Sequence, residues 1–525
     1  MNGVQTCALP ISLEATNAQT GDSLARQQVE AAGKEQVLKS LDKAATDLRQ
    51  KLGESLASVQ QFATPLEQAT TSSLEALKEY SLGYADHLRL DEENALPHLK
   101  RAVELDPNFA MANAVLGIVS SNLGNSKEAN QYLKKAYDLR DRASEREKFY
   151  IQGHYYDTET GDMEKAVELY EQWTRTYPRH NTPWDNLSLA HQALGNFDQA
   201  LAAATEAMHV DPKDTFAYQH QVACYMYTNR FDEAKSVAET AKSLKVDAIG
   251  VHNSLFAIAT LQGDQAAMQR ESAWGNGKAI EAIFLQRTSF YQDAIGKIKL
   301  SRETAQHALD LGKQHGFTEL PTSITGTQAF RDASHGFTDS ARQKADEVLR
   351  LPGDIFPRSS AAMTLAELGD TAQSQKLIDD LTKEYPSDTA IKYVVAPSVQ
   401  ALNLLHRNKP QDAIAALEIG RKYELGQMGG VGAYRVIYVR GMAYLQLHDG
   451  VKAAAEFQKI LDHRGINPIS GIPPLAQLNL ARAYALQGDN VKARTAYQDF
   501  LALWKDADPD VPVLIATKAE YAKLK

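Results

Sequence analysis

A 34-residue periodicity constrains the fold of this chain more than any other feature of its sequence. The segments "TPWDNLSLAHQALGNFDQALAAATEAMHVDP" and "FAYQHQVACYMYTNRFDEAKSVAETAKSLKV" carry residues of the same kind 34 positions apart. A period of this length indicates one supersecondary unit repeated along the chain. The matching pairs are Trp184 and Tyr218, Phe197 and Phe231, Ala200 and Ala234, Ala207 and Ala241, Gly161 and Gly195, Ala166 and Ala200, and Pro178 and Pro212.

Each repeated position has a physical role in a pair of antiparallel helices. A small residue such as Ala200 lets the second helix approach the first closely. Gly161, Gly195 and Asn229 stand where the turn between the helices needs a left-handed backbone, which Gly and Asn tolerate. Pro212 ends the second helix or starts the next hairpin. One hairpin cannot bury its apolar face alone, so neighbouring hairpins must stack.

This pattern resembles the tetratricopeptide repeat, and the resemblance implies an all-α superhelix of stacked antiparallel helix hairpins over residues 74–525. Roughly 12 hairpins fit at about 34 residues per unit. Between about residues 249 and 351 the helical periodicity persists but most signature residues are lost. Other repeat-like segments are Ala95–Asn108, Val115–Leu139, Leu365–Asp388, Val439–Leu461 and Leu480–Leu501.

The segment before the repeats has a different pattern of apolar residues. Within residues 13–62, two alternating stretches flank Thr20-Gly21-Asp22, which predicts a hairpin, and Lys34–Ser58 has helical spacing of apolar residues. One hairpin with one helix is marginal alone, so we expect a truncated α/β segment, the remnant of a larger domain. Residues 63–73 read as a polar linker, and Ser73 is expected to open the first repeat helix.

The first twelve residues, "MNGVQTCALPIS", differ from everything that follows. The codons GGA-GTT-CAG-ACG-TGT-GCT-CTT-CCG-ATC encode "GVQTCALPI" residue for residue. That nucleotide string resembles an adapter used in short-read sequencing libraries. We therefore expect residues 1–12 to be a disordered artefact, and the remainder to be the back part of something larger. The stretch lacks the basic start and apolar core of a signal peptide.

Composition excludes several classes of protein. With 43% hydrophobic and 23% charged residues and a formal net charge of -10, the chain is no general binder of nucleic acid or anionic membranes. No run of about 18 apolar residues appears, so no membrane span is expected. Beyond Cys7 only Cys224 remains, so no disulfide framework is expected. The compartment stays open: cytoplasmic, or extracytoplasmic if a parent protein has a span upstream.

Motifs that would carry catalysis are missing from the sequence. No HExxH, CxxC or Walker A motif occurs. The cluster Gly426, Gly429, Gly430 and Gly432 follows a helical stretch, whereas a dinucleotide fingerprint follows a strand; it predicts an inter-hairpin loop. His220 and Cys224 stand four residues apart and form half a metal site at most. We expect no catalytic residue, no cofactor and no metal, and thus no enzyme.

A binding surface is predicted on the first helix of each hairpin. In the tetratricopeptide pattern the inner-face positions of these helices form a groove that takes an extended peptide or a partner helix. The Lys/Asn clamp that some members use for C-terminal carboxylates has no match here. The predicted groove residues are Asp185, Leu189 and Gln192, followed by Gln219, Ala223, Met226 and Tyr227.

Several longer phrases are similar to something narrower than a generic repeat. "GKEQVLKSLDKAATDLRQKLGESLASVQQFATPLEQATTSSLEALKEYSLG", "LKRAVELDPNFAMANAVLG", "AAAEFQKILDHRGI" and "AYQDFLALWKDADPDVPVL" resemble the C-terminal region of bacterial, acidobacterial-type serine/threonine kinase signalling proteins. The resemblance implies a non-catalytic scaffold or regulatory module that binds a protein partner. The kinase motifs themselves are absent from this sequence. Related arrays follow winged-helix transcription regulators, and the coding sequence upstream of Leu13 would distinguish the two parents.

Overall fold

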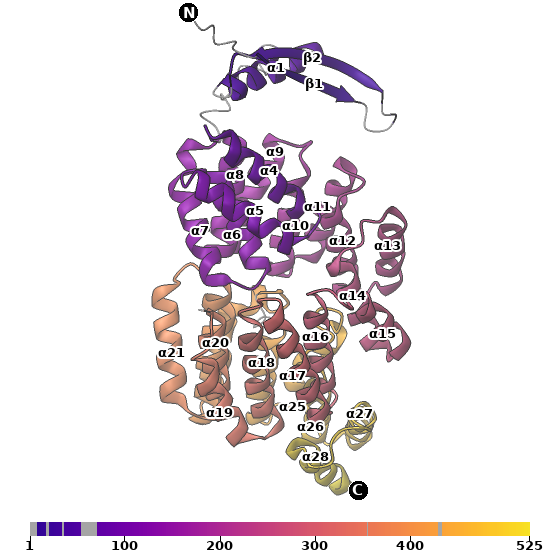
Figure 1. Cartoon of the computed structure of the whole chain (residues 1–525). Coiled ribbons are helices and arrows are strands. Elements are labelled where there is room, and N and C mark those ends of the chain that lie inside the picture. Colours follow the sequence, from indigo (N-terminus) through magenta and orange to yellow (C-terminus); the bar gives the residue numbers. More distant parts are fainter. Residues whose placement is uncertain are drawn as a thin grey trace, which may run out of the picture. The chain divides into compact units, whose positions relative to one another are not determined.

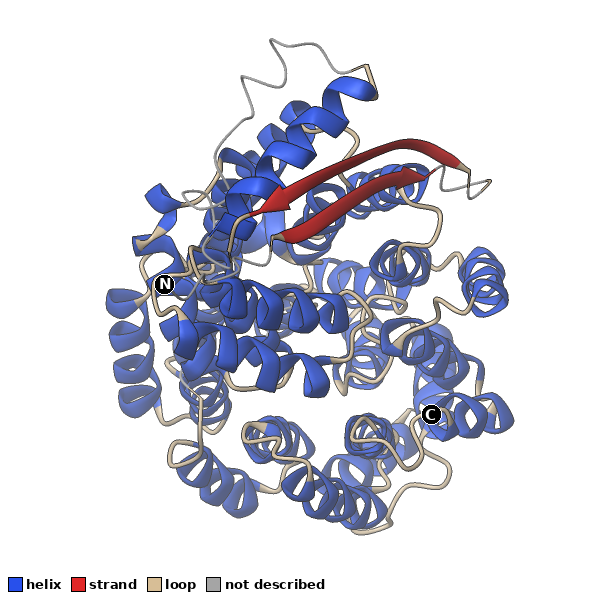
Figure 2. Ribbon diagram, turned by 45° about the horizontal axis from the view of Figure 1, so that its top comes forward, coloured by secondary structure: helices blue, strands red, loops and turns tan. Residues whose placement is uncertain are grey.

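The computed structural model describes residues 8–16, 20, 22–33, 36–53, 71–353, 355–428 and 433–524. Strands occur only near the N-terminus of these ranges (Figure 2). The first elements are β1 (Leu9–Thr16), β2 (Ser23–Ala31), α1 (Val37–Lys51), α4 (Leu74–His87), α5 (Glu92–Leu105), α6 (Ala110–Asn122), α7 (Ser126–Asp138) and α8 (Glu145–His154). By contact the chain forms two compact units: residues 1–123 with 128–159, and residues 124–127 with 160–525, here called unit 1 and unit 2.

Strands β1 and β2 pair antiparallel, from Leu9 opposite Ala31 to Thr16 opposite Ser23. The predicted hairpin is therefore present, and helix α1 occupies the central part of the predicted helical segment. Leu9–Ser12 pair in this sheet although the sequence predicts disorder over residues 1–12, because their alternation matches that of β2. Residues 1–7, including Cys7, lie outside the described residues. So do residues 54–70, which include most of the predicted linker at 63–73.

The helical repeats begin where the sequence predicts. The Ser73 hydroxyl accepts a hydrogen bond from the Ala76 backbone N–H and caps α4, an N-terminal capping contact that satisfies an otherwise orphan donor. Helices α4 to α27 number 24, the count that 12 hairpins require at the predicted repeat length. The tetratricopeptide-like helical-repeat fold is therefore confirmed (Figure 1).

Helices follow one another through the described part of unit 2, including residues 249–351, where the signature is weak. Its elements are α9 (Met163–Thr176), α10 (Asn181–Leu194), α11 (Phe197–Val210), α12 (Thr215–Tyr227), α13 (Phe231–Leu244), α14 (Ile249–Gln262), α15 (Gln265–Ala273), α16 (Glu281–Ala294), α17 (Ile298–Gln314), α18 (Leu320–His335), α19 (Thr338–Val348), α20 (Ile355–Glu367), α21 (Thr371–Glu384), η4 (Ile391–Val395), α22 (Ala396–His406), α23 (Pro410–Leu417), η5 (Glu418–Tyr423), α24 (Arg435–Gln446), α25 (Gly450–Asp462), α26 (Ile472–Leu486), α27 (Asn490–Leu503) and α28 (Pro512–Lys523).

A left-handed residue closes the turn inside every pair, and a small buried residue follows five positions later in nearly all of them. The predicted residues Gly161, Gly195 and Asn229 have φ of 65°, 80° and 59°. The full set of turn residues is Leu90, Gly124, Gly161, Gly195, Asn229, Gly263, Gly296, Gly336, Gly369, Asn408, His448 and Gly488. The small residues are Ala95, Ala129, Ala166, Ala200, Ala234, Ala267 (four positions on), Ser301, Ala341, Ser374, Ala413, Ala453 and Ala493.

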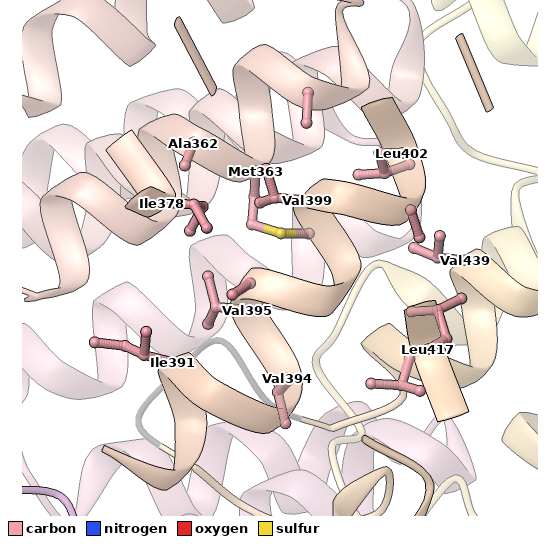
Figure 3. Packing of buried hydrophobic residues seen from close by; sticks show 14 of the residues in the cluster. Ala362, Met363, Ile378, Ile391, Val394, Val395, Val399, Leu402, Leu417 and Val439 are labelled. Carbon is pink, nitrogen blue, oxygen red and sulfur yellow. The ribbon is translucent and has the colours of Figure 1, made fainter. Parts of the chain in front are cut away.

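The core of unit 2 lies between successive pairs. In Figure 3, Met363 of α20, Ile378 of α21 and Val399 of α22 meet in one of these layers, which is apolar and buried. Neighbouring pairs share such layers along the unit. Within the described ranges, no helix combines the length and apolarity needed to cross a bilayer.

Unit 2 also holds contacts between segments more than 200 residues apart. The Gly161 carbonyl accepts a 2.9 Å bond from the Thr389 N–H, and the Gln192 carbonyl accepts one of 3.2 Å from the Gln427 N–H. The Asn229 side chain donates to the Asp462 carbonyl at 2.7 Å. Each of these turns in the first part of unit 2 therefore contacts one inter-hairpin loop in its later part.

Gly296 continues the same series. Its carbonyl accepts a bond of 3.0 Å from the Asp508 N–H, and the Trp504 indole donates to the Ala294 carbonyl at 3.0 Å. We call these four places, at Gly161, Gly195, Asn229 and Gly296, the turn–loop contacts. In a linear solenoid each repeat contacts only its neighbours in the sequence. In unit 2, repeats that are far apart in the sequence also contact one another.

Gly465→Ala is expected to destabilise unit 2 by about 1–3 kcal/mol, the usual cost of overpacking. A Cβ there would lie 2.0 Å from the Met226 carbonyl oxygen and 2.8 Å from Asn229 Oδ1, so one turn–loop contact must open. Gly471→Ala is the matched control, because its Cβ would meet nothing closer than 3.7 Å. Urea unfolding measures both variants, and equal stability of the two would contradict the prediction.

Candidate functional site

The predicted groove residues lie on the first helices α10 and α12, in three different environments. Leu189 is the most accessible, with 51% of its surface exposed. Gln219, Ala223 and Tyr227 are partly buried. Asp185, Gln192 and Met226 are buried, with 6%, 4% and 5% exposure. The accessible part of the predicted groove is therefore narrower than the seven residues indicate.

The buried members connect neighbouring helices. The Gln192 amide hydrogen-bonds the Ser188 hydroxyl and the His220 ring nitrogen Nδ1, both at 3.2 Å. Gln219 packs against Gly250 at the start of α14, where a Cβ would come within 2.4 Å of its Oε1. The Tyr227 ring lies 5.1 Å from that of Phe197. These contacts fix the spacing of α10, α12 and α14.

Asp185 is a buried acidic residue. Burial raises its pKa well above the usual range, and the neighbouring carboxylate of Asp214 raises it further. Asp214 is committed elsewhere, because it accepts from the Phe216 and Ala217 N–H groups at 2.9 and 3.2 Å and caps α12. Asp214 therefore positions the start of α12.

His220 and Cys224, four residues apart on α12, are both buried. Burial lowers the pKa of His220 to about 4 and raises that of Cys224 to about 12. The imidazole is thus neutral and bound to Gln192, and the thiol stays protonated, whereas nucleophilic or metal-binding cysteines need the thiolate. Of the predicted glycine cluster, Gly426 packs against the Ala193 carbonyl; the other three glycines lie outside the described residues.

Sequence reasoning missed the charged side chains that later first helices carry. Arg287 lies on α16, Arg331 on α18, Glu367 on α20 and Arg435 on α24. Electrostatic interaction with Arg287 lowers the pKa of Tyr227 slightly against the dominant effect of burial, which raises it to about 12. The predicted groove therefore adjoins α16. No local signal marks these positions, because α16 and α18 carry several other polar residues and α24 carries a second arginine.

Asp388→Asn tests the acid beside the Gly161 turn. Asp388 Oδ1 accepts from the Ile391 N–H at 2.8 Å, and burial raises the Asp388 pKa from 3.8 to about 6. A carboxyl with a raised folded pKa loses stability as pH rises from about 4 to about 6. Asn stays neutral and keeps the acceptor, so we expect the variant to gain on the order of 3 kcal/mol at pH 7 and almost nothing at pH 4.

Denaturant unfolding between pH 4 and 8 measures this difference. Asp370→Asn is the opposite control, because Arg342 hydrogen-bonds Asp370 and lowers the Asp370 pKa. The ionised Asp370 contributes stability above its unfolded pKa, and this contribution is lost as pH falls. The Asp370→Asn variant should therefore be less stable than the unaltered protein at pH 7. A pH-independent difference between Asp388→Asn and the unaltered protein would refute the assignment.

Comparison with known proteins supports the repeat assignment in two places. Tetratricopeptide-repeat models match residues 438–512 and residues 184–205. The first match covers α24–α27, and the second begins at Trp184 in α10. The search among curated proteins gives no match.

Solved structures also align with parts of this chain. A crystal structure of MamA aligns with 21% identity over 31% of this chain and 94% of that chain, with a TM-score of 0.22. A tetratricopeptide repeat protein from Parabacteroides merdae aligns with 12% identity over 78% of this chain and 99% of that chain, with a TM-score of 0.21. The assignment of a tetratricopeptide-like helical-repeat fold rests on the hairpins themselves and on the two matched segments.

Proposed function

We propose that this chain is a non-catalytic protein–protein interaction scaffold that holds a partner peptide or helix on its first helices. The observation that carries the proposal is Leu189, which is 51% exposed on a helix whose other aliphatic residues are buried and whose Trp184 is half-buried. Ala223 on α12 is partly exposed as well. Apolar side chains presented by successive helices are the usual anchors for a bound segment.

Partner capture with paired variants tests the scaffold. Leu189→Glu and Ala223→Glu place charge on the proposed surface with little effect on the core. Leu244→Glu is the matched control, because Leu244 is 41% exposed on the second helix α13. A partner held by the groove should be lost from both groove variants and kept by the control. Equal capture by all three, with helicity intact by circular dichroism, would place the binding surface elsewhere.

We further propose that the scaffold serves a serine/threonine kinase-type signalling protein, with a winged-helix transcription regulator as the alternative parent. The support is the resemblance of the quoted phrases. Sequencing the gene upstream of codon 13 tests it: kinase motifs support the first parent, and a basic winged-helix segment supports the second. The chain itself should transfer no phosphate from ATP to protein substrates.

A further inference from the structure

Other buried and half-buried arginines in unit 2, such as Arg440 and Arg482, have acceptors. Arg440 donates to Glu456 at 2.8 Å and to Glu424 at 2.7 Å. Arg482 binds both carboxylate oxygens of Glu520, at 2.9 and 2.8 Å. Such pairing is the rule, because a guanidinium without an acceptor is costly to bury.

Arg287 and Arg435 break this rule. Among the described residues, Nε and Nη1 of Arg435 and Nε of Arg287 are buried without a hydrogen-bond partner. Arg440 also has one such nitrogen, Nη1, but its other nitrogens bind carboxylates. The Arg435 guanidinium lies 3.7 Å from the centre of the Phe330 ring, a cation–π contact that holds it in place but accepts no hydrogen bond. Glu367 acts on Arg435 only at a distance.

The electrostatics agree with this geometry. Burial lowers the pKa of Arg435 to about 10, although Glu367 and Tyr438 partly oppose the change. Burial also lowers the pKa of Arg287. The pKa of Glu367 is raised by burial, so that carboxyl is a weak counter-charge. Both guanidiniums would therefore be stabilised by an anion from outside the chain.

Arg331 connects the two positions. It donates to the Phe290 carbonyl on α16, one turn after Arg287, and to the Ile469 carbonyl at 2.8 Å. It also lies near enough to Arg435 to lower the Arg435 pKa. On these first helices Arg331, which also lies 3.6 Å from Asp293, is therefore near Arg435, and Arg287 is near Tyr227 of the predicted groove.

Both side chains keep partial exposure, so an acceptor in solvent meets the outer part of each side chain and reaches the buried nitrogens once the side chain turns outward. Water would supply a hydrogen-bond acceptor without charge, whereas a carboxylate supplies both and matches the planar guanidinium fork. We propose that Arg287 and Arg435 bind the carboxylate side chains of an acidic peptide segment from a partner protein. This inference rests on the proposed scaffold function and names the class of partner that it holds.

Fluorescence anisotropy with two capped, labelled peptides, hexaglutamate and hexaglutamine, tests the inference on the full chain at physiological salt. We expect tighter binding of hexaglutamate by at least roughly tenfold, the lower end of what charge-assisted hydrogen bonds contribute. The chain's net charge of -10 opposes unspecific binding of an acidic peptide. Equal affinity for both peptides, or no binding of either, would overturn the acidic-partner inference.

Single variants locate the effect. Arg435→Gln and Arg287→Gln should each weaken hexaglutamate binding roughly tenfold to a hundredfold, and Arg421→Gln, an exposed arginine paired with Glu418, should leave it unchanged. Because neither guanidinium has an acceptor, both variants should melt no lower than the unaltered protein. Unchanged hexaglutamate binding by folded Arg287→Gln and Arg435→Gln would overturn the inference. Continued partner capture that depends on Leu189 would then leave the scaffold proposal standing.

Discussion

Replacing Arg440 with methionine is expected to destabilise unit 2 by about 3–5 kcal/mol, the cost of leaving a buried charge without its partner. Arg440 is 0% exposed and pairs with Glu424, which is 4% exposed, and with Glu456, which is 13% exposed. Its pKa is raised because hydrogen bonds to both carboxylates outweigh the effect of burial. Without Arg440 two carboxylates stay in the interior, and only Glu424 keeps a cation, Lys459.

Urea unfolding followed by circular dichroism measures this loss. The control is the triple variant Glu424→Gln, Arg440→Met and Glu456→Gln, which removes all three charges and should recover most of the stability, because a neutral replacement of a buried ion network is often harmless. Loss of less than about 1 kcal/mol in the single variant would show that the network carries little of the folding free energy.

The local structure of the repeats follows closely from the sequence. Gly195 and Ala200 predict a left-handed turn and a close helix approach, and both occur as predicted. The same pair of requirements holds at Gly336 and Ala341, in the region where the aromatic signature is lost. Turn and close-approach positions admit few residue types, whereas the bulky positions accept many apolar side chains. The spacing of turn and small residues therefore persists in the region where the aromatic signature is lost.

Long-range contacts could not be predicted in the same way. The register that brings Asn229 to Gly465 depends on the small rotation between every pair of hairpins in between, and this rotation adds up over more than 200 residues. Nothing local in the sequence encodes that sum. For the same reason the predicted groove includes Gln192 and Met226, which later loops help to cover: Gln427 donates to the Gln192 carbonyl, and Gly465 packs against that of Met226.

The missed arginines have a related cause. The sequence alone shows Arg435 as one polar residue between Tyr434 and Val436, and most arginines in such positions reach water or a carboxylate. Only the assembled helices show that the Phe330 ring packs against its guanidinium and that no acceptor among the described residues binds its Nε and Nη1. A site formed by side chains about 150 residues apart has no signature within one repeat.

Trp504→Ala is expected to cost unit 2 about 3–5 kcal/mol, the usual loss for a fully buried Trp. Trp504 is 2% exposed, and its ring lies 5.0 Å from that of Phe500 and 5.3 Å from that of His335. Its indole N–H reaches the Ala294 carbonyl, so the cavity opens at a turn–loop contact. Trp504→Phe keeps most of the apolar volume and should lose only about 1–3 kcal/mol, the cost of an unpaired buried carbonyl.

The shape of the unfolding curve separates a cross-linked unit from a linear array. With its turn–loop contacts intact, unit 2 should unfold in one transition, because its late hairpins are tied to its early ones. In Trp504→Ala the segment around α27 and α28 loses its contact with the turn at Gly296 and should unfold first. Hydrogen exchange should then show a separate, earlier unfolding step for this segment. In a linear array each repeat depends only on its neighbours, so the same substitution would destabilise α26–α28 and leave exchange near Gly296 unchanged. Faster exchange at Ala294–Ile298 in Trp504→Ala therefore distinguishes the two arrangements, and its absence would mean that the contact does not couple them.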